Sequence, residues 1–205
     1  MRVTLPESIP GHARRQLRSV LAARRRSAPA AQRTPAALRV ARNVDREMHL
    51  RSRWRIAVYA ALPEELDTAP LIALARRRGC RIYLPRIDRR RDSRAMQFVE
   101  MRGPLKRNRL GIAEPQTGET RGARWLDVVF LPLVGFDAQG VRLGTGGGYY
   151  DRAFAFRRWR SAWHVPRLVG LAYAFQQVER IAPAAHDVLL DAVVTDEGII
   201  RCSTG

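Results

Sequence analysis

The sequence almost lacks lysine. Of its 37 basic residues only Lys106 is a lysine, so the net charge of +18 at pH 7 comes nearly entirely from arginine. We attribute this preference to a GC-rich coding sequence rather than to a requirement at each position. A net positive field attracts anionic ligands. Nucleic acid and nucleotides such as ATP are both anionic, so the net charge alone does not distinguish between these two classes of ligand.

Cysteine and long apolar runs are also scarce. Cys80 and Cys202 have no metal-like spacing with histidine, so both are expected to be free thiols in a reducing compartment. No apolar run approaches the roughly 20 residues that a membrane span needs. The first residues, Met1 to Pro6, lack the apolar core of a signal peptide. We therefore expect a cytoplasmic protein without a membrane partner.

Two familiar glycine motifs are missing from the glycine-rich stretch. Tyr149 occupies the third glycine position of a dinucleotide fingerprint, and a P-loop would need a lysine that is absent there. What is present is a buried apolar run at 128–131, a turn at 137–140, four glycines between 144 and 148, and a helical pattern at 149–160. Glycines let backbone N–H groups approach an anion, and a helix N-terminus adds unpaired donors. The stretch predicts a phosphate-binding loop, with Arg142 as a bidentate phosphate ligand and Asp151 as a Mg²⁺ ligand.

The remaining chain alternates helical and strand patterns. Helices are expected at 12–26, from Thr34-Pro35 to about 51, from a cap at Thr68 to Gly79, and at 175–181. Strands are expected at 56–59, 81–84, 96–101, 126–131, 168–172, 192–195 and 198–201, and 103–124 is expected to be a long surface excursion. This order predicts one α/β domain over residues 1–205. Its mainly parallel sheet has helices on both faces, and the glycine-rich phosphate-binding loop lies between a strand and a helix.

The segment from Gly135 to Asp151, GFDAQGVRLGTGGGYYD, resembles the signature of 5-formyltetrahydrofolate cyclo-ligases, also called methenyltetrahydrofolate synthetases. That pattern, G-F-D-x-x-G-x-R-L-G-x-G-x-G-Y-Y-D, is met residue by residue, and weaker likeness extends from about Arg14 to Ile200. The resemblance implies an ATP- and Mg²⁺-dependent enzyme. Transfer of the γ-phosphoryl group to the formyl oxygen of 5-formyltetrahydrofolate would create a leaving group, and ring closure would give 5,10-methenyltetrahydrofolate, ADP and phosphate.

The resemblance also implies an ATP site. Its residues would be Arg14, Arg18, Arg142, Leu143, Gly144, Thr145, Gly146, Gly147, Gly148, Tyr149 and Tyr150. Arg14 stands where the family often has lysine, and the short opening helix is equally explained as a solvated basic face. Arg142, Tyr149 and Tyr150 would take part in the chemistry, the tyrosines at the junction of folate and ATP. The alternative for one of the tyrosines is packing into the core.

The folate side is implied by Glu65-Leu66-Asp67-Thr68, which resembles a family segment that faces the substrate. A carboxylate suits the donor pair of the pterin ring, and the sequence leaves open whether Glu65 or Asp67 supplies it. Acidic residues at a helix N-terminus are the alternative explanation. Leu62, Phe136 and Tyr149 would complete the substrate pocket.

The metal site is implied to comprise Asp151 and Asp191, directly or through water. The expected partners are therefore ATP and 5-formyltetrahydrofolate, with or without a polyglutamate tail, and we expect a monomer. Two other classes stay open: a basic nucleic-acid-binding protein, and a sugar-phosphate isomerase or acyl-CoA transferase on a related sheet. The block from Arg142 to Asp151 argues against the second, because such a protein acts without nucleotide.

Overall fold

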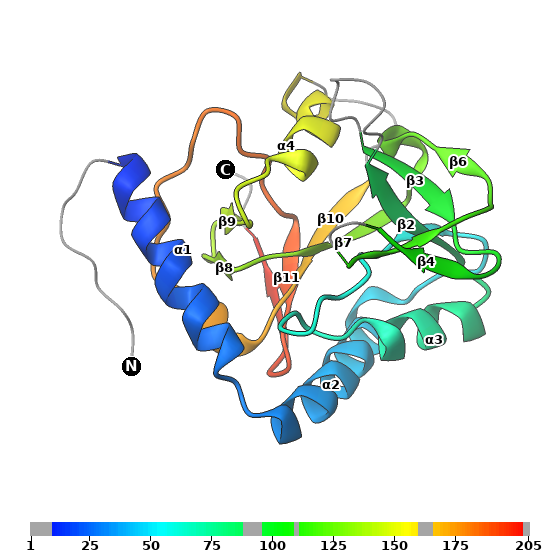
Figure 1. The fold of residues 1–205 in the computed structure, drawn as a ribbon, viewed down its shortest axis with the longest axis horizontal. Helices are drawn as coiled ribbons and strands as arrows, with labels where there is room; N and C mark the ends of the chain where they lie inside the picture. The colour runs from blue at the N-terminus through cyan, green and yellow to red at the C-terminus, as the bar shows by residue number, and fades with distance from the viewer. Residues whose placement is uncertain (1–9, 88–95, 109–110, 160–165, 203–205) are drawn as a thin grey trace.

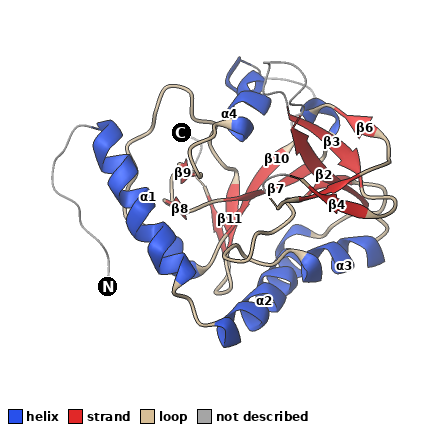
Figure 2. Ribbon diagram, viewed as in Figure 1, coloured by secondary structure: helices blue, strands red, loops and turns tan. Residues whose placement is uncertain are grey.

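The computed structural model describes residues 10–87, 96–108, 111–159 and 166–202 and contains one large mixed sheet (Figures 1 and 2). The sheet has eight strands in the order β12-β11-β10-β7-β1-β2-β3-β6. Their bounds are β1 Arg55–Ala57, β2 Arg81–Ile87, β3 Met96–Glu100, β6 Thr120–Arg121, β7 Val128–Pro132, β10 Arg167–Leu171, β11 Ala192–Val194 and β12 Ile199–Arg201. Two small hairpins accompany it, β4 (Leu105–Arg107) with β5 (Ala113–Pro115), and β8 (Gly135–Phe136) with β9 (Arg142–Leu143).

The five central strands, β2, β1, β7, β10 and β11, are parallel, whereas β12, β3 and β6 pair antiparallel at the two sides. In chain order the parallel strands lie 2-1-3-4-5, a doubly wound arrangement whose order reverses between β1 and β7. Ligands of such sheets bind outside the carboxyl ends of the strands at that switch point. The expected mainly parallel α/β sheet is therefore confirmed, and its topology indicates where a site should lie.

Strand side chains alternate between two apolar clusters, as the two-residue period of a strand requires. Ile56 of β1 and Phe130 of β7 point to one face, where α2 (Ala30–Met48) and α3 (Ala69–Arg77) cover them. Ala57 and Leu131 point to the other face, which is covered by the segment that contains α4 (Tyr149–Ala153) and the 3-10 helix η2 (Ala155–Trp159). Because both faces of the central strands are buried, the sequences of these strands are continuous apolar runs.

Helix α1 (Pro10–Arg26) stands at one side of the sheet and packs on the β8–β9 hairpin (Figure 1). Its Leu17 and Leu21 are buried against Val134, Val141 and Leu143. These two leucines form the apolar stripe of α1 and determine which face of the helix turns toward the hairpin. Arginines on the same face of α1 therefore also lie toward the hairpin.

Several expected boundaries were wrong for physical reasons. Helix α2 begins at Ala30, four residues before Thr34, and contains Pro35 in its second turn, where packing outweighs the lost N–H. Thr68 precedes α3 but its hydroxyl donates to the Tyr59 carbonyl; Asp67 accepts from the Ala69 N–H instead. The expected helix over 149–160 ends at Ala153, and the chain continues from Ala155 to Trp159 as 3-10 turns.

Other differences concern short elements. The expected excursion at 103–124 contains β4, β5, β6 and the 3-10 turn η1 (Ala123–Trp125), and 175–181 holds only the 3-10 turn η3 (Ala174–Gln176). Residues 88–95, whose charged sequence predicts a loop, lie outside the described residues. Among the residues that are described, no helix is both long and apolar enough to cross a membrane.

Candidate functional site

The segments that carry most of the predicted site residues follow the carboxyl ends of β1 and β7, the switch point of the sheet. Asp191 does not: it directly precedes β11, and its N–H donates to the Leu168 carbonyl near the start of the parallel strand β10, at the opposite edge. After β1 the chain makes a turn that carries Leu62 to Thr68, here called the Glu65 turn. After β7 it forms the β8–β9 hairpin and then the glycine loop, Gly144 to Gly148. A separate hollow of about 630 Å³ lies at the opposite edge, where β1 and β2 begin. There Arg55 pairs with Asp127 and Arg81 with Glu100, so its charges are largely balanced.

The glycine loop needs its glycines for backbone shape and for access. Gly146 and Gly148 have φ of +103° and +63°, a region that L side chains avoid. A side chain at Gly144 would meet nothing within 4 Å, so the backbone there faces open space. Because α4 has only five residues, its dipole adds little, and exposed backbone N–H groups with nearby arginines must supply most of any anion affinity.

Arg18 of α1 lies alongside this loop. Its Nε donates to the Gly144 carbonyl at 2.8 Å, and its guanidinium carbon lies 4.0 Å from where a Gly146 Cβ would be. Neither of its terminal amino groups has a hydrogen-bond partner among the described residues. On the other side of the loop, Arg152 donates to the Gly147 carbonyl at 2.8 Å and covers the Tyr149 ring. The loop is thus held between two arginines.

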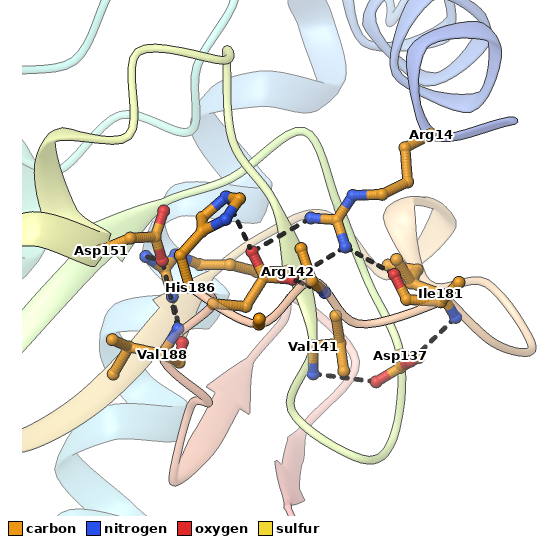
Figure 3. A network of polar contacts seen from close by, with 12 residues as sticks. Arg14, Asp137, Val141, Arg142, Asp151, Ile181, His186 and Val188 are labelled. Atoms are coloured by element: carbon orange, nitrogen blue, oxygen red, sulfur yellow. Dashed lines mark hydrogen bonds and ion pairs between the residues drawn. The ribbon is translucent and has the colours of Figure 1, made fainter. Parts of the chain in front are cut away.

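Arg142 and Asp151, predicted as separate phosphate and metal ligands, bind each other (Figure 3). Arg142 is buried; its Nη2 donates to Asp151 Oδ1 at 2.7 Å, and its Nη1 donates to the Val188 carbonyl. The Val188 N–H donates to the same Asp151 oxygen at 3.2 Å. Asp151 Oδ2 has no bond to another described residue. The arginine therefore orients the carboxylate and leaves one oxygen available.

Arg14 joins α1 to the late loop that precedes β11 (Figure 3). Its two amino groups donate to Asp187 at 2.8 and 3.2 Å, and one also donates to the Ala182 carbonyl at 2.5 Å. His186 lies 3.9 Å from Asp187 and is otherwise exposed. The structure thus puts Arg14 near the predicted phosphate loop but gives it a carboxylate partner of its own.

The Glu65 turn separates the two candidate pterin ligands. Asp67 is exposed and caps α3 through the Ala69 N–H at 2.9 Å. Glu65 is 9% exposed and accepts from the Leu62 N–H at 3.0 Å. Burial raises the pKa of the Glu65 carboxyl, and the Leu62 N–H and the Arg25 charge oppose that rise. A buried carboxylate with little compensation is suited to a ligand that donates hydrogen bonds.

The tyrosines take different positions. Tyr150 stacks on Phe154 with ring centroids 6.5 Å apart, and burial, with the Glu65 charge in addition, raises the pKa of its hydroxyl. Tyr150 follows the glycine loop in the sequence, and its hydroxyl is near enough to the Glu65 turn to be acted on by the Glu65 charge. Tyr149 is half-buried under Arg152. Leu62 is also half-buried, whereas Phe136 has no exposed surface and lies inside the second apolar cluster.

Asp191 is engaged by protein groups on both oxygens. Oδ1 accepts from Arg157 at 2.7 Å and Oδ2 from the Leu168 N–H at 2.6 Å. No group of three or more His, Cys, Asp or Glu side chains suited to a metal ion occurs in the described part of the chain. One free oxygen of Asp151 nevertheless fits a Mg²⁺ that is held mainly by phosphates, because such ions use one or two carboxylates.

Three contributors were missed from sequence. Asp137, 1% exposed, accepts from the N–H groups of Gln139, Val141 and Ile181 and so ties the hairpin turn to the late loop. Arg25 is buried on α1 beside the Glu65 turn. Asp187 binds Arg14. Only Asp137 had a sequence signal, as a turn-forming residue inside the long motif; the other two depend on contacts between distant segments.

Fold and site together define a doubly wound α/β protein with a glycine loop and a buried carboxylate at the switch point of its sheet. The chain belongs to the 5-formyltetrahydrofolate cyclo-ligase family, an enzyme family whose model matches residues 10–196. It is 33% identical over 186 residues to the 5-formyltetrahydrofolate cyclo-ligase of Haemophilus influenzae, covering 88% of this chain and 97% of that one.

Two further likenesses agree with this membership. The Escherichia coli (strain K12) cyclo-ligase is 38% identical over 144 residues, which cover 68% of this chain and 76% of the relative. The solved structure of the 5,10-methenyltetrahydrofolate synthetase of Aquifex aeolicus matches with a TM-score of 0.78 and 27% identity over 94% of each chain. The predicted family is therefore confirmed.

Proposed function

We propose that this chain converts 5-formyltetrahydrofolate to 5,10-methenyltetrahydrofolate with ATP and Mg²⁺, releasing ADP and phosphate. One observation carries the proposal for this site: the Glu65 turn and the glycine loop follow the neighbouring strands β1 and β7, and the Glu65 charge acts on the hydroxyl of Tyr150, close after the glycine loop. A reaction that joins a phosphate donor to a formyl group needs two binding regions at one place. Family membership supplies the substrate class.

The phosphates of ATP would lie on the glycine loop, against backbone N–H groups of Gly144 to Gly148 and the free amino groups of Arg18. Arg14 would join them by exchanging its Asp187 contact for a phosphate. Arg142 acts through Asp151, which it orients at 2.7 Å. Leu143 is fully buried and would contribute only its backbone, and Thr145 is exposed at the tip of the loop.

Mg²⁺ would be held by Asp151 through its free oxygen, and when bound it neutralises charge on the phosphates. Asp191, whose two oxygens already bind Arg157 and the Leu168 N–H, remains a predicted metal ligand that its contacts do not favour. We therefore carry Asp151 alone into the proposal.

The pterin ring would place its ring N–H and amino group against Glu65, with Leu62 beside it and Tyr149 covering the junction. Phe136 remains a predicted pocket residue, but its side chain is fully buried in the second apolar cluster and offers no surface to a ligand. Tyr150 keeps its proton at neutral pH because its pKa is raised, so its hydroxyl can donate to the formyl or phosphoryl oxygen.

Chemically, the formyl oxygen attacks the γ-phosphorus and ADP leaves. N10 then attacks the activated formyl carbon, the phosphate departs with the former formyl oxygen, and the N10 proton is released. The site has to position both substrates and stabilise negative charge, which is what the glycine loop, Arg18 and Asp151 offer.

The test is the absorbance band of methenyltetrahydrofolate on mixing protein, 5-formyltetrahydrofolate, ATP and Mg²⁺. We expect a rise that requires all four components. Absence of any rise with folded protein would contradict the proposal.

A further inference from the structure

Helix α1 carries three arginines on one face. At 100° per residue, Arg14, Arg18 and Arg25 lie within about 40° of one another around the helix axis. Each contacts a different segment of the candidate site. Arg14 binds the late loop at Asp187, Arg18 binds the glycine loop at Gly144, and Arg25 reaches the Glu65 turn. The first two were assigned to phosphates; nothing in the reaction described so far uses the third.

Arg25 is buried in an environment that compensates its charge poorly. It is 4% exposed, and its Nη1 donates to the Leu133 carbonyl, just beyond the end of β7, at 3.2 Å. Its ion pair with Glu64 spans 3.6 Å, and its Nε has no hydrogen-bond partner among the described residues. A buried guanidinium is retained only where nearby negative charge offsets its loss of water. The second such charge is Glu65, the residue after Glu64.

We propose that Arg25 is a positioning residue of the folate side: it fixes the Glu65 turn against the carboxyl end of β7 and compensates the charge of the Glu65 carboxylate. This rests on the proposed function, in which Glu65 binds the pterin ring. The cation of Arg25 opposes the rise in the pKa of Glu65 that burial causes. The role explains why α1 extends beyond the phosphate-binding arginines for two more turns.

Among the groups around Glu65, Arg25 is the cation whose charge lowers the pKa of the Glu65 carboxyl. Tyr59 beyond β1 and Tyr150 of α4 both have raised pKa values, chiefly from burial and next from the Glu65 charge, and stay neutral at working pH. Glu64, on the same turn, adds negative charge and raises the pKa of Glu65. Arg33 of α2 also reaches this turn, where it donates to the Pro63 carbonyl at 2.6 Å, but Arg25 is the cation that lowers the pKa of Glu65. Removing the Arg25 charge therefore leaves Glu65 with neutral tyrosines, the Glu64 carboxylate and an Arg33 that is held by a carbonyl.

The direct experiment follows the Glu65 carboxyl by ¹³C NMR in protein labelled at glutamate, without substrates. Glu65→Gln assigns the resonance. We expect the titration midpoint of Glu65 to move upward in Arg25→Met and to stay near that of the unaltered protein in Arg25→Lys. A midpoint that is unchanged or lower in Arg25→Met would overturn the proposal. Since no turnover is measured, this outcome is independent of whether the proposed reaction is correct.

A kinetic arm tests the consequence for the substrate. In Arg25→Met the KM for 5-formyltetrahydrofolate should rise roughly tenfold at mildly acidic pH, as for loss of a hydrogen bond to a charged group, while the KM for ATP stays unchanged. The same substitution in a Glu65→Gln background should have little further effect. An equal loss in that background would assign Arg25 to general stability instead. If Arg25→Met does not fold, Glu64→Gln is added to remove the unpaired carboxylate, and the same readouts apply.

Discussion

The glycine-loop side and the Glu65 side of the site are built in opposite ways. Around the loop, charges form pairs that are only partly buried: Arg14 with Asp187 from a distant part of the chain, and Arg142 with Asp151 within the same motif. At the Glu65 turn a single carboxylate is buried among apolar and tyrosine side chains. In the proposed function, an incoming phosphate would displace or extend the pairs of the first design. The second keeps one acceptor poorly compensated until a donor-rich ligand arrives.

The largest effect is expected at Asp151. In Asp151→Asn the free oxygen offered to Mg²⁺ loses its charge, and kcat should fall about 10²- to 10³-fold, as for removal of a group that stabilises transition-state charge. Turnover is measured by methenyltetrahydrofolate absorbance over a range of Mg²⁺ concentrations. Asp191→Asn is the matched control: it should lower stability but keep the Mg²⁺ dependence. Equal kinetic losses in two folded variants would restore Asp191 as a metal ligand.

Substitution of Glu65 should have the next largest effect on kinetics, and only the KM for 5-formyltetrahydrofolate should change. Glu65→Gln leaves the pterin donor pair without its carboxylate, so the KM for 5-formyltetrahydrofolate should rise roughly 10- to 100-fold, as for a charged hydrogen bond. Asp67→Asn, two residues away, keeps its cap on α3 and should leave KM unchanged. If Asp67→Asn were the damaging change, the assignment of the two carboxylates would have to be exchanged.

Substitution of Arg18 should change the KM for ATP but not the KM for 5-formyltetrahydrofolate. Arg18→Met removes the two amino groups beside the glycine loop, and the KM for ATP should rise about tenfold. Arg15, exposed on the same helix, provides the control Arg15→Met with the same change in net charge. A similar rise in both variants would show that ATP responds to the overall positive field and not to a contact.

The smallest effect concerns stability. The folded pKa of Glu65 is raised, so as pH falls toward the unfolded value of 4.5 the folded protein takes up the proton first and gains stability. Glu65→Gln should therefore unfold at higher urea concentration than the unaltered protein at neutral pH, and the gap should narrow as pH decreases. A gap that widens toward acidic pH would contradict a raised pKa of the buried Glu65 carboxyl.

Much of this arrangement could be predicted from sequence, because apolar runs and glycines act locally. The parallel strands near 56–59, 126–131 and 168–172 followed from pattern, whereas the phosphate-binding roles of the glycine loop and of Arg18 stay predictions. The pairing of Arg14 with Asp187 could not, since 173 residues separate the partners. Likewise the end of α4 at Phe154 depends on packing of that ring in the core, which outweighs the helical pattern of 149–160.

The choice between Glu65 and Asp67 shows the same limit. Two carboxylates two residues apart are equivalent in a pattern, and only the packing of the turn buries one and exposes the other. Arg25 gave no signal of its own for a similar reason. In a chain with 36 arginines, one more on a basic helix is unremarkable until its burial is seen.

The most direct test of a single site with two dissimilar sides is the fate of the formyl oxygen. The substrate is 5-formyltetrahydrofolate with ¹⁸O in its formyl group. Mass spectrometry of the inorganic phosphate then shows whether that oxygen formed a bond to the γ-phosphorus of ATP. The account predicts one ¹⁸O in phosphate for each methenyltetrahydrofolate formed, in the unaltered protein and in the residual turnover of Arg18→Met and Glu65→Gln. Unlabelled phosphate accompanying product formation would contradict it, because ATP cleavage and ring closure would then not share an atom.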